Sequence, residues 1–88
     1  MLEPMIATLK EHEAELRRRG LERAAVHCQI AWLQLVGLRE EAAQEGEVPA
    51  QALVRNVVRA LLRQIEREAP EALPELRDRL NPLLDAQR

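Results

Sequence analysis

One stretch of the chain, Ala24 to Leu38, contains no charged residue, although charged residues make up 32% of the 88-residue sequence. It reads AAVHCQIAWLQLVGL, and an uncharged segment in so charged a sequence is expected to lie where water is scarce. A helix that crosses a bilayer needs about 20 consecutive apolar residues, which is more than this stretch supplies. We therefore predict no membrane span, but a helix that is buried on more than one side.

The spacing of apolar residues predicts an all-α fold. Apolar residues recur three and four positions apart almost throughout, and no segment alternates with the period of two that is typical of a strand. We expect residues 1–88 to form one domain, a three- to four-helix bundle with a long central buried helix. The expected helices are at about 4–19, 21–45, 49–69 and a short one at 74–84, in a tail that Pro70, Pro74 and Pro82 divide.

The boundary between the first two helices depends on Gly20, a plausible left-handed cap after Arg17, Arg18 and Arg19. No Ser, Thr, Asp or Asn stands nearby to cap the start of a second helix. A tight break at Gly20 is the favoured interpretation, and one long helix bent at Gly20 is the alternative.

The second helix carries two apolar stripes. One has the 3-4 spacing of a heptad seam: Leu21, Ala24, Cys28, Ala31, Leu35, Leu38 and Ala42. The other stripe runs beside it and consists of Val26, Ile30, Leu33 and Gly37. Trp32 and Val36 widen the apolar arc further. Burying one large side chain is worth about 1.5–3 kcal/mol, and we expect the remaining helices to be too few to cover the whole arc. We therefore predict a homodimer that forms through the seam and Trp32.

The third helix carries a stripe of arginines opposite its leucine and valine face. Arg55, Arg59, Arg63 and Arg67 recur every four residues, and no acidic residue occurs from Val48 to Ile65. Such a stripe suits an acidic partner protein or phosphates, with Arg19 and Arg23 as a second contact. The alternative is a solvated face that is paired with the chain's own Glu40, Glu41, Glu45 and Glu47. No aromatic residue lies among these arginines, which excludes base stacking.

The leucines of the tail also allow two interpretations. These leucines are Leu73, Leu76, Leu80, Leu83 and Leu84. They could cap the bundle's own core, or they could dock as a short helix into a groove of another protein.

Residue types that commonly carry catalysis are scarce. The chain has no serine or tyrosine and one lysine, and its three glycines are scattered, so no phosphate-binding loop is expected. His27 and Cys28 point about 100° apart on a helix, and a zinc site needs about four ligands, so we expect no metal and no cofactor. The strip from Glu11 to Glu15, which includes His12, is interpreted as a solvated face.

These observations favour a non-enzymatic protein that acts by binding a partner protein, as a small adaptor, regulator or inhibitor. The alternative is a nucleic-acid-binding protein that uses the arginine stripe. The single cysteine excludes an internal disulfide, and residues 1–13 contain no apolar run that fits a signal peptide. We therefore expect the protein to act in the cytoplasm.

Overall fold

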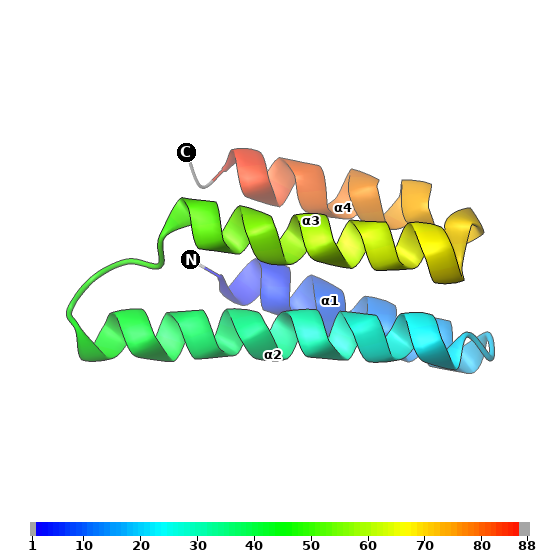
Figure 1. Cartoon of the computed structure of the whole chain (residues 1–88), viewed down its shortest axis with the longest axis horizontal. Coiled ribbons are helices and arrows are strands. Elements are labelled where there is room, and N and C mark those ends of the chain that lie inside the picture. Colours follow the sequence, from blue (N-terminus) through cyan, green and yellow to red (C-terminus); the bar gives the residue numbers. More distant parts are fainter. Residues whose placement is uncertain (1, 87–88) are drawn as a thin grey trace.

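The structure, a computed structural model, describes residues 2 to 86 and arranges them as an up-down-up-down bundle of helices (Figure 1). The helices are α1 (Glu3–Arg18), α2 (Glu22–Gln44), α3 (Gln51–Glu68) and α4 (Leu73–Asp85), and a 3-10 turn (Pro70–Ala72) precedes α4. α1 and α3 each pack against both α2 and α4, so the four helices surround one core. The expected all-helical bundle is confirmed, and the helices begin and end close to the expected residues.

The break at Gly20 is confirmed, and α1 and α2 form an antiparallel hairpin. Gly20 has a φ of 78°, in the left-handed region. The amide of Leu21 donates to the carbonyl of Leu16 at 2.9 Å, and the amide of Gly20 donates to the carbonyl of Arg17 at 3.0 Å. This pair of hydrogen bonds is the Schellman motif, and it satisfies carbonyls at the end of α1 without a side-chain cap. α2 ends in the same way at Gly46, whose φ is 69°.

The three prolines of the tail have different effects, which corrects the expectation that all three divide it. Pro70 opens the 3-10 turn, and Pro74 lies in the first turn of α4, where the missing amide costs no helical hydrogen bond. Pro82 lies inside α4. The helix continues past it, since the carbonyl of Pro82 accepts a hydrogen bond from the amide of Ala86 at 3.0 Å.

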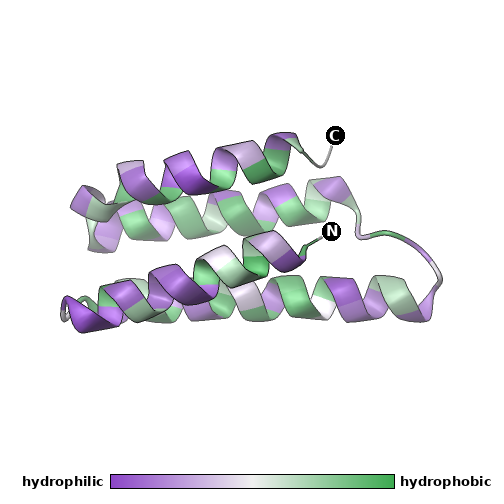
Figure 2. Ribbon diagram, turned by 180° about the vertical axis from the view of Figure 1, so that it is seen from behind, coloured by the Kyte–Doolittle hydropathy of each residue, from purple (hydrophilic) through white to green (hydrophobic). Residues whose placement is uncertain are grey.

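The core is built from the inward positions of all four helices. Apolar and polar residues alternate along each ribbon (Figure 2). α4 contributes Leu76 and Leu80, which are fully buried, and Leu73, Leu83 and Leu84 pack against the core while partly buried. The tail leucines therefore complete the chain's own core.

α2 is buried on one side only, which corrects the expectation of a helix buried on more than one side. Its heptad seam lies inside the chain, where α1 and α3 cover it. Five seam residues are buried there: Ala24, Cys28, Ala31, Leu35 and Ala42. Leu21 and Leu38 are partly buried beside them. A second copy cannot contact the buried seam residues while the bundle is intact, so the seam is not available as the expected dimer interface.

Candidate protein interaction surface

The second apolar stripe of α2 points away from the core. We call Val26, Ile30, Leu33 and Gly37 the outward face. Ile30 is 47% exposed and Leu33 is 49% exposed, and Val26 and Gly37 are exposed as well. Because successive residues of a helix are turned by about 100°, Ile30 lies on the side of α2 opposite Cys28. The outward face is therefore largely open to solvent.

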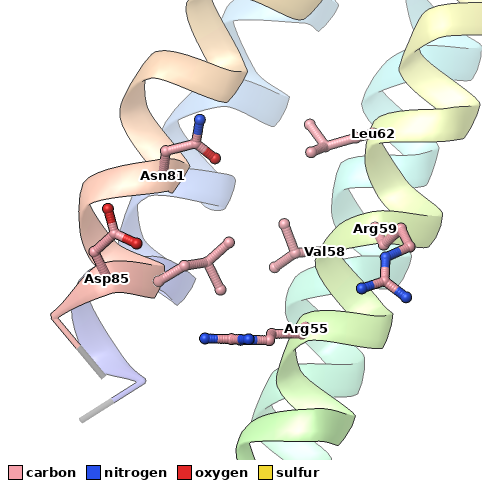
Figure 3. Close-up of a pocket in the computed structure, with 7 residues that line it drawn as sticks. Arg55, Val58, Arg59, Leu62, Asn81 and Asp85 are labelled. Carbon is pink, nitrogen blue, oxygen red and sulfur yellow. The ribbon is translucent and has the colours of Figure 1, made fainter. Parts of the chain in front are cut away.

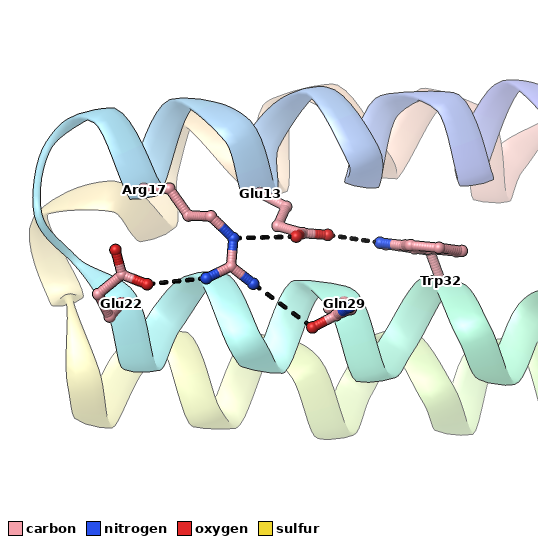
Figure 4. A network of polar contacts seen from close by, with 5 residues as sticks. All are labelled: Glu13, Arg17, Glu22, Gln29 and Trp32. Atoms are coloured by element: carbon pink, nitrogen blue, oxygen red, sulfur yellow. Dashed lines mark hydrogen bonds and ion pairs between the residues drawn. The ribbon is translucent and has the colours of Figure 1, made fainter.

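A polar network between α1 and α2 holds α2 in this rotation (Figure 4). The carboxylate of Glu13 accepts a hydrogen bond from Trp32 Nε1 at 2.6 Å and one from Arg17 Nε at 3.1 Å. The guanidinium of Arg17 also donates to Glu22 at 2.7 Å and to Gln29 at 3.4 Å. Three residues of α2 are thus tied to α1, and turning α2 so that it buries the outward face would break these contacts.

Trp32, which was expected at a dimer interface, makes an internal contact with α1. Its ring is partly buried beside α1, and Lys10 Nζ lies 4.7 Å from the centroid of the ring. This is within the range of a cation–π interaction. The indole N–H and one face of the Trp32 ring are therefore both engaged within the chain.

A groove between α2 and α3 borders the outward face at Gly37. It measures about 420 Å³ and combines apolar walls with a few polar groups: Gln34, Gly37, Leu38, Glu41, Leu53, Asn56 and Val57. Leu53 is among the exposed large apolar residues of the chain. The apolar surface of α2 thus continues onto α3 at one end of the outward face.

The charged residues around the outward face differ in whether they have partners. Glu22 and Glu40 are paired within the chain, with Arg17 at 2.7 Å and with Arg39 at 3.3 Å. Arg23 and Glu41 are exposed, and neither forms an ion pair in the structure of residues 2–86.

The arginine stripe lies on α3 and is open to solvent. Arg59, Arg63 and Arg67 are exposed and Arg55 is partly buried. No ion pair of the described residues involves any of these four side chains, so the expected alternative of pairing with the chain's own glutamates is not observed.

Two arginines of the stripe line a second groove, between α3 and α4 (Figure 3). It measures about 260 Å³ and has an apolar floor with charged and polar groups at its rim: Arg55, Val58, Arg59, Leu62, Asn81, Leu84 and Asp85. Asp85 reduces the net positive charge of this groove. Arg19 and Arg23 come from the α1–α2 hairpin and do not line it.

His12 is buried, which corrects its expected place on a solvated face. Its side chain faces the core at 1% exposure, and neither ring nitrogen has a hydrogen-bond partner. Burial lowers the pKa of His12, an effect that the nearby carboxylate of Glu75 opposes. The signal in the sequence is the spacing of Leu2, Met5, Leu9 and Leu16, in which position 12 completes the heptad pattern of α1.

We expect His12 to make the stability of the bundle depend on pH. Its pKa is lower in the folded chain than the usual 6.5, so the unfolded chain binds more protons and stability falls as the pH decreases below about 6.5. His12→Leu also removes two buried nitrogens that lack partners, which should stabilise the fold by about 1–3 kcal/mol. Urea unfolding between pH 5.5 and 7.5 measures both effects. The control is His27→Gln, which removes the other histidine of the chain. A variant His12→Leu with an unchanged pH slope would contradict this account.

Groups that could bind a metal are not found in the described part of the chain. No three histidine, cysteine, aspartate or glutamate side chains of residues 2–86 gather at one place. Within the same residues, no helix is long and apolar enough to span a bilayer.

The fold and its surface define a small four-helix bundle with an uncovered apolar helix face. Comparisons with protein-family models, with curated proteins and with solved structures found no match.

Proposed function

We propose that the chain is a non-enzymatic protein interaction module, a small adaptor, regulator or inhibitor that binds a partner protein in the cytoplasm. The outward face of α2 is the proposed binding surface. The observation that carries the proposal is the exposure of Val26, Ile30 and Leu33 on a helix whose rotation is held by other contacts. A contiguous exposed apolar patch with a polar rim is typical of a protein interaction site.

The shape and chemistry of this surface suit a helix as the opposing element. The outward face is a straight stripe with 4-3-4 spacing, and the apolar groove beside Gly37 extends it onto α3. Amphipathic helices bind such surfaces through residues at the same spacing. Contact would remove Ile30 and Leu33 from water, and apolar burial contributes about 25 cal/mol per Å².

The environment of the reactive residues supports a non-enzymatic role. Cys28 is fully buried, and burial raises the pKa of its thiol to about 12, so almost no thiolate forms at neutral pH. The imidazole of His12 is enclosed in the core, where a substrate in solution cannot reach it. A single free cysteine also fits the reducing environment of the cytoplasm.

A second candidate function is nucleic-acid binding through the arginine stripe. The observation that favours it is the lack of ion pairs at Arg55, Arg59, Arg63 and Arg67 among the described residues. Arginines that are free of carboxylates can pair with phosphates. The net charge of −2 works against this function, and so does Asp85 at the edge of the stripe.

A binding experiment in extract of the native cell separates the two functions. The tagged chain is compared with Ile30→Glu/Leu33→Glu and with Arg55→Glu/Arg59→Glu/Arg63→Glu, with and without nuclease, and circular dichroism checks that each variant is folded. We expect the outward-face variant to lose its bound proteins and the arginine variant to retain them, whether or not nuclease is present. The opposite result would favour nucleic-acid binding: the arginine variant loses its bound proteins, nuclease releases them from the unmodified chain, and the outward-face variant retains them.

A further inference from the structure

We infer that the partner that fits the outward face is a second copy of this chain, packed through α2 in the antiparallel direction. This inference rests on the proposed function, because it names the partner of the same surface. It places the homodimer interface on the side of α2 opposite the heptad seam.

The first argument is the order of residues along the outward face. An antiparallel pair with its twofold axis between Ile30 and Leu33 opposes Ile30 of each copy to Leu33 of the other. It also opposes Val26 of each copy to Gly37 of the other. Gly37 has no heavy atom within 4 Å of the place where a side chain would begin, and the groove beside it is lined by Leu38, Leu53 and Val57. Val26 of the second copy therefore meets open apolar space at Gly37.

The second argument is charge complementarity at both ends of the face. Arg23 and Glu41 lie about five full turns apart, so they are on the same edge of the outward face. The antiparallel pairing brings Arg23 of each copy to Glu41 of the other, because the midpoint of these two residues nearly coincides with that of Ile30 and Leu33. Neither side chain has an ion-pair partner among the described residues of the single chain. The dimer thus forms two symmetric ion pairs from charges that one copy leaves unpaired.

The opposite edge of the face tolerates the same pairing. The antiparallel pairing brings Glu22 of one copy near Glu40 of the other copy, and these two carboxylates carry the same charge. Each carboxylate is already paired within its own chain, Glu22 with Arg17 and Glu40 with Arg39. In a parallel pair, the edge that holds Arg23 and Glu41 would face the opposite edge of the other copy. Arg23 would then lie near Glu22, which Arg17 already pairs with, and Glu41 would lie near the like charge of Glu40. Only the antiparallel direction pairs Arg23 with Glu41, so the charges favour it.

Disulfide cross-linking tests the inference directly. Val26→Cys and Gly37→Cys are prepared as separate full-length variants with different tags, mixed in equal amounts and oxidised at a concentration at which sedimentation shows association. We expect the mixture to yield the 26–37 cross-link and each variant alone to yield little. Cys28 can stay in place, because it is buried and its pKa is about 12. Efficient cross-linking of Val26→Cys to itself would overturn the antiparallel direction.

Charge reversal provides a second and independent measurement. Arg23→Glu should weaken the dimer about tenfold, since it removes two ion pairs and creates two repulsions, and Arg23→Glu/Glu41→Arg should restore the affinity. A double variant no stronger than the single one would overturn the pairing.

A chain that sediments as a 10.1 kDa monomer at all concentrations would overturn the self-association itself. The proposed function would then still be decided by the extract experiment with Ile30→Glu/Leu33→Glu, so the two failures are distinguishable.

Discussion

Leu35→Ala is expected to lower the free energy of unfolding by about 2–5 kcal/mol, because it leaves a cavity in the core. The same replacement at Leu33, two residues along the same helix, is expected to change it by less than about 0.5 kcal/mol in the monomer. Leu35 is 0% exposed and Leu33 is 49% exposed. The two variants remove the same atoms and differ only in the direction of the side chain.

Urea unfolding at low micromolar concentration or below, where association is weakest, measures both values. Equal losses for Leu33→Ala and Leu35→Ala would mean that α2 is covered on both sides, contrary to the rotation described above. A larger loss for Leu33→Ala would mean that the core lies on the other stripe.

Ile30→Glu/Leu33→Glu is expected to abolish association while the helix content stays unchanged. Two carboxylates at the centre of an apolar contact would have to be buried without partners, at a cost of several kcal/mol per ion. In the free chain the same positions are exposed, and the cost of each change should be within about 0.5 kcal/mol. Sedimentation velocity measures the association, and circular dichroism measures the helix content.

The matched control for this variant is Ala7→Glu/Ala14→Glu. It adds the same charge at two exposed positions of α1, so it separates the loss of apolar contact from a general effect of net charge. Association that is lost equally in both variants would assign the effect to charge repulsion and not to the outward face.

The heptad spacing of α2 predicted which residues form a buried apolar seam, but it did not predict which helices cover that seam. The seam from Leu21 to Ala42 was expected to face a second copy, because the other helices were expected to be too few to cover α2. In the structure α1 and α3 cover that seam, and small residues such as Ala24, Cys28 and Ala31 let them approach closely. The stripe left without cover is the one with the larger side chains Ile30 and Leu33.

The angle between these two stripes follows from the spacing of their residues in the sequence. Two residues along a helix correspond to a turn of about 200°, so Cys28 and Ile30 could not both face one neighbour. A charge-free segment was interpreted as buried on more than one side, although exposed apolar residues are common when they form a binding surface.

The polar residues were harder to place, because their partners lie far away in the sequence. The contact of Trp32 with Glu13 links two helices, and neither residue indicates the other before the hairpin is formed. His12 was interpreted with its charged neighbours Glu11 and Glu13, although its position in the heptad of α1 indicated burial. The arginine stripe was found from the spacing of four, but its lack of ion pairs depends on where α2 and α4 lie.

The most direct measurement of the central claim, that the chain associates through the outward face of α2, is radical footprinting over a range of protein concentrations. Labelling of Val26, Ile30 and Leu33 should fall as the concentration rises, while labelling of exposed residues elsewhere stays constant, for example at Pro70 and Pro82. Equal labelling of the outward face at every concentration, in a sample that sedimentation shows to be associated, would contradict the claim.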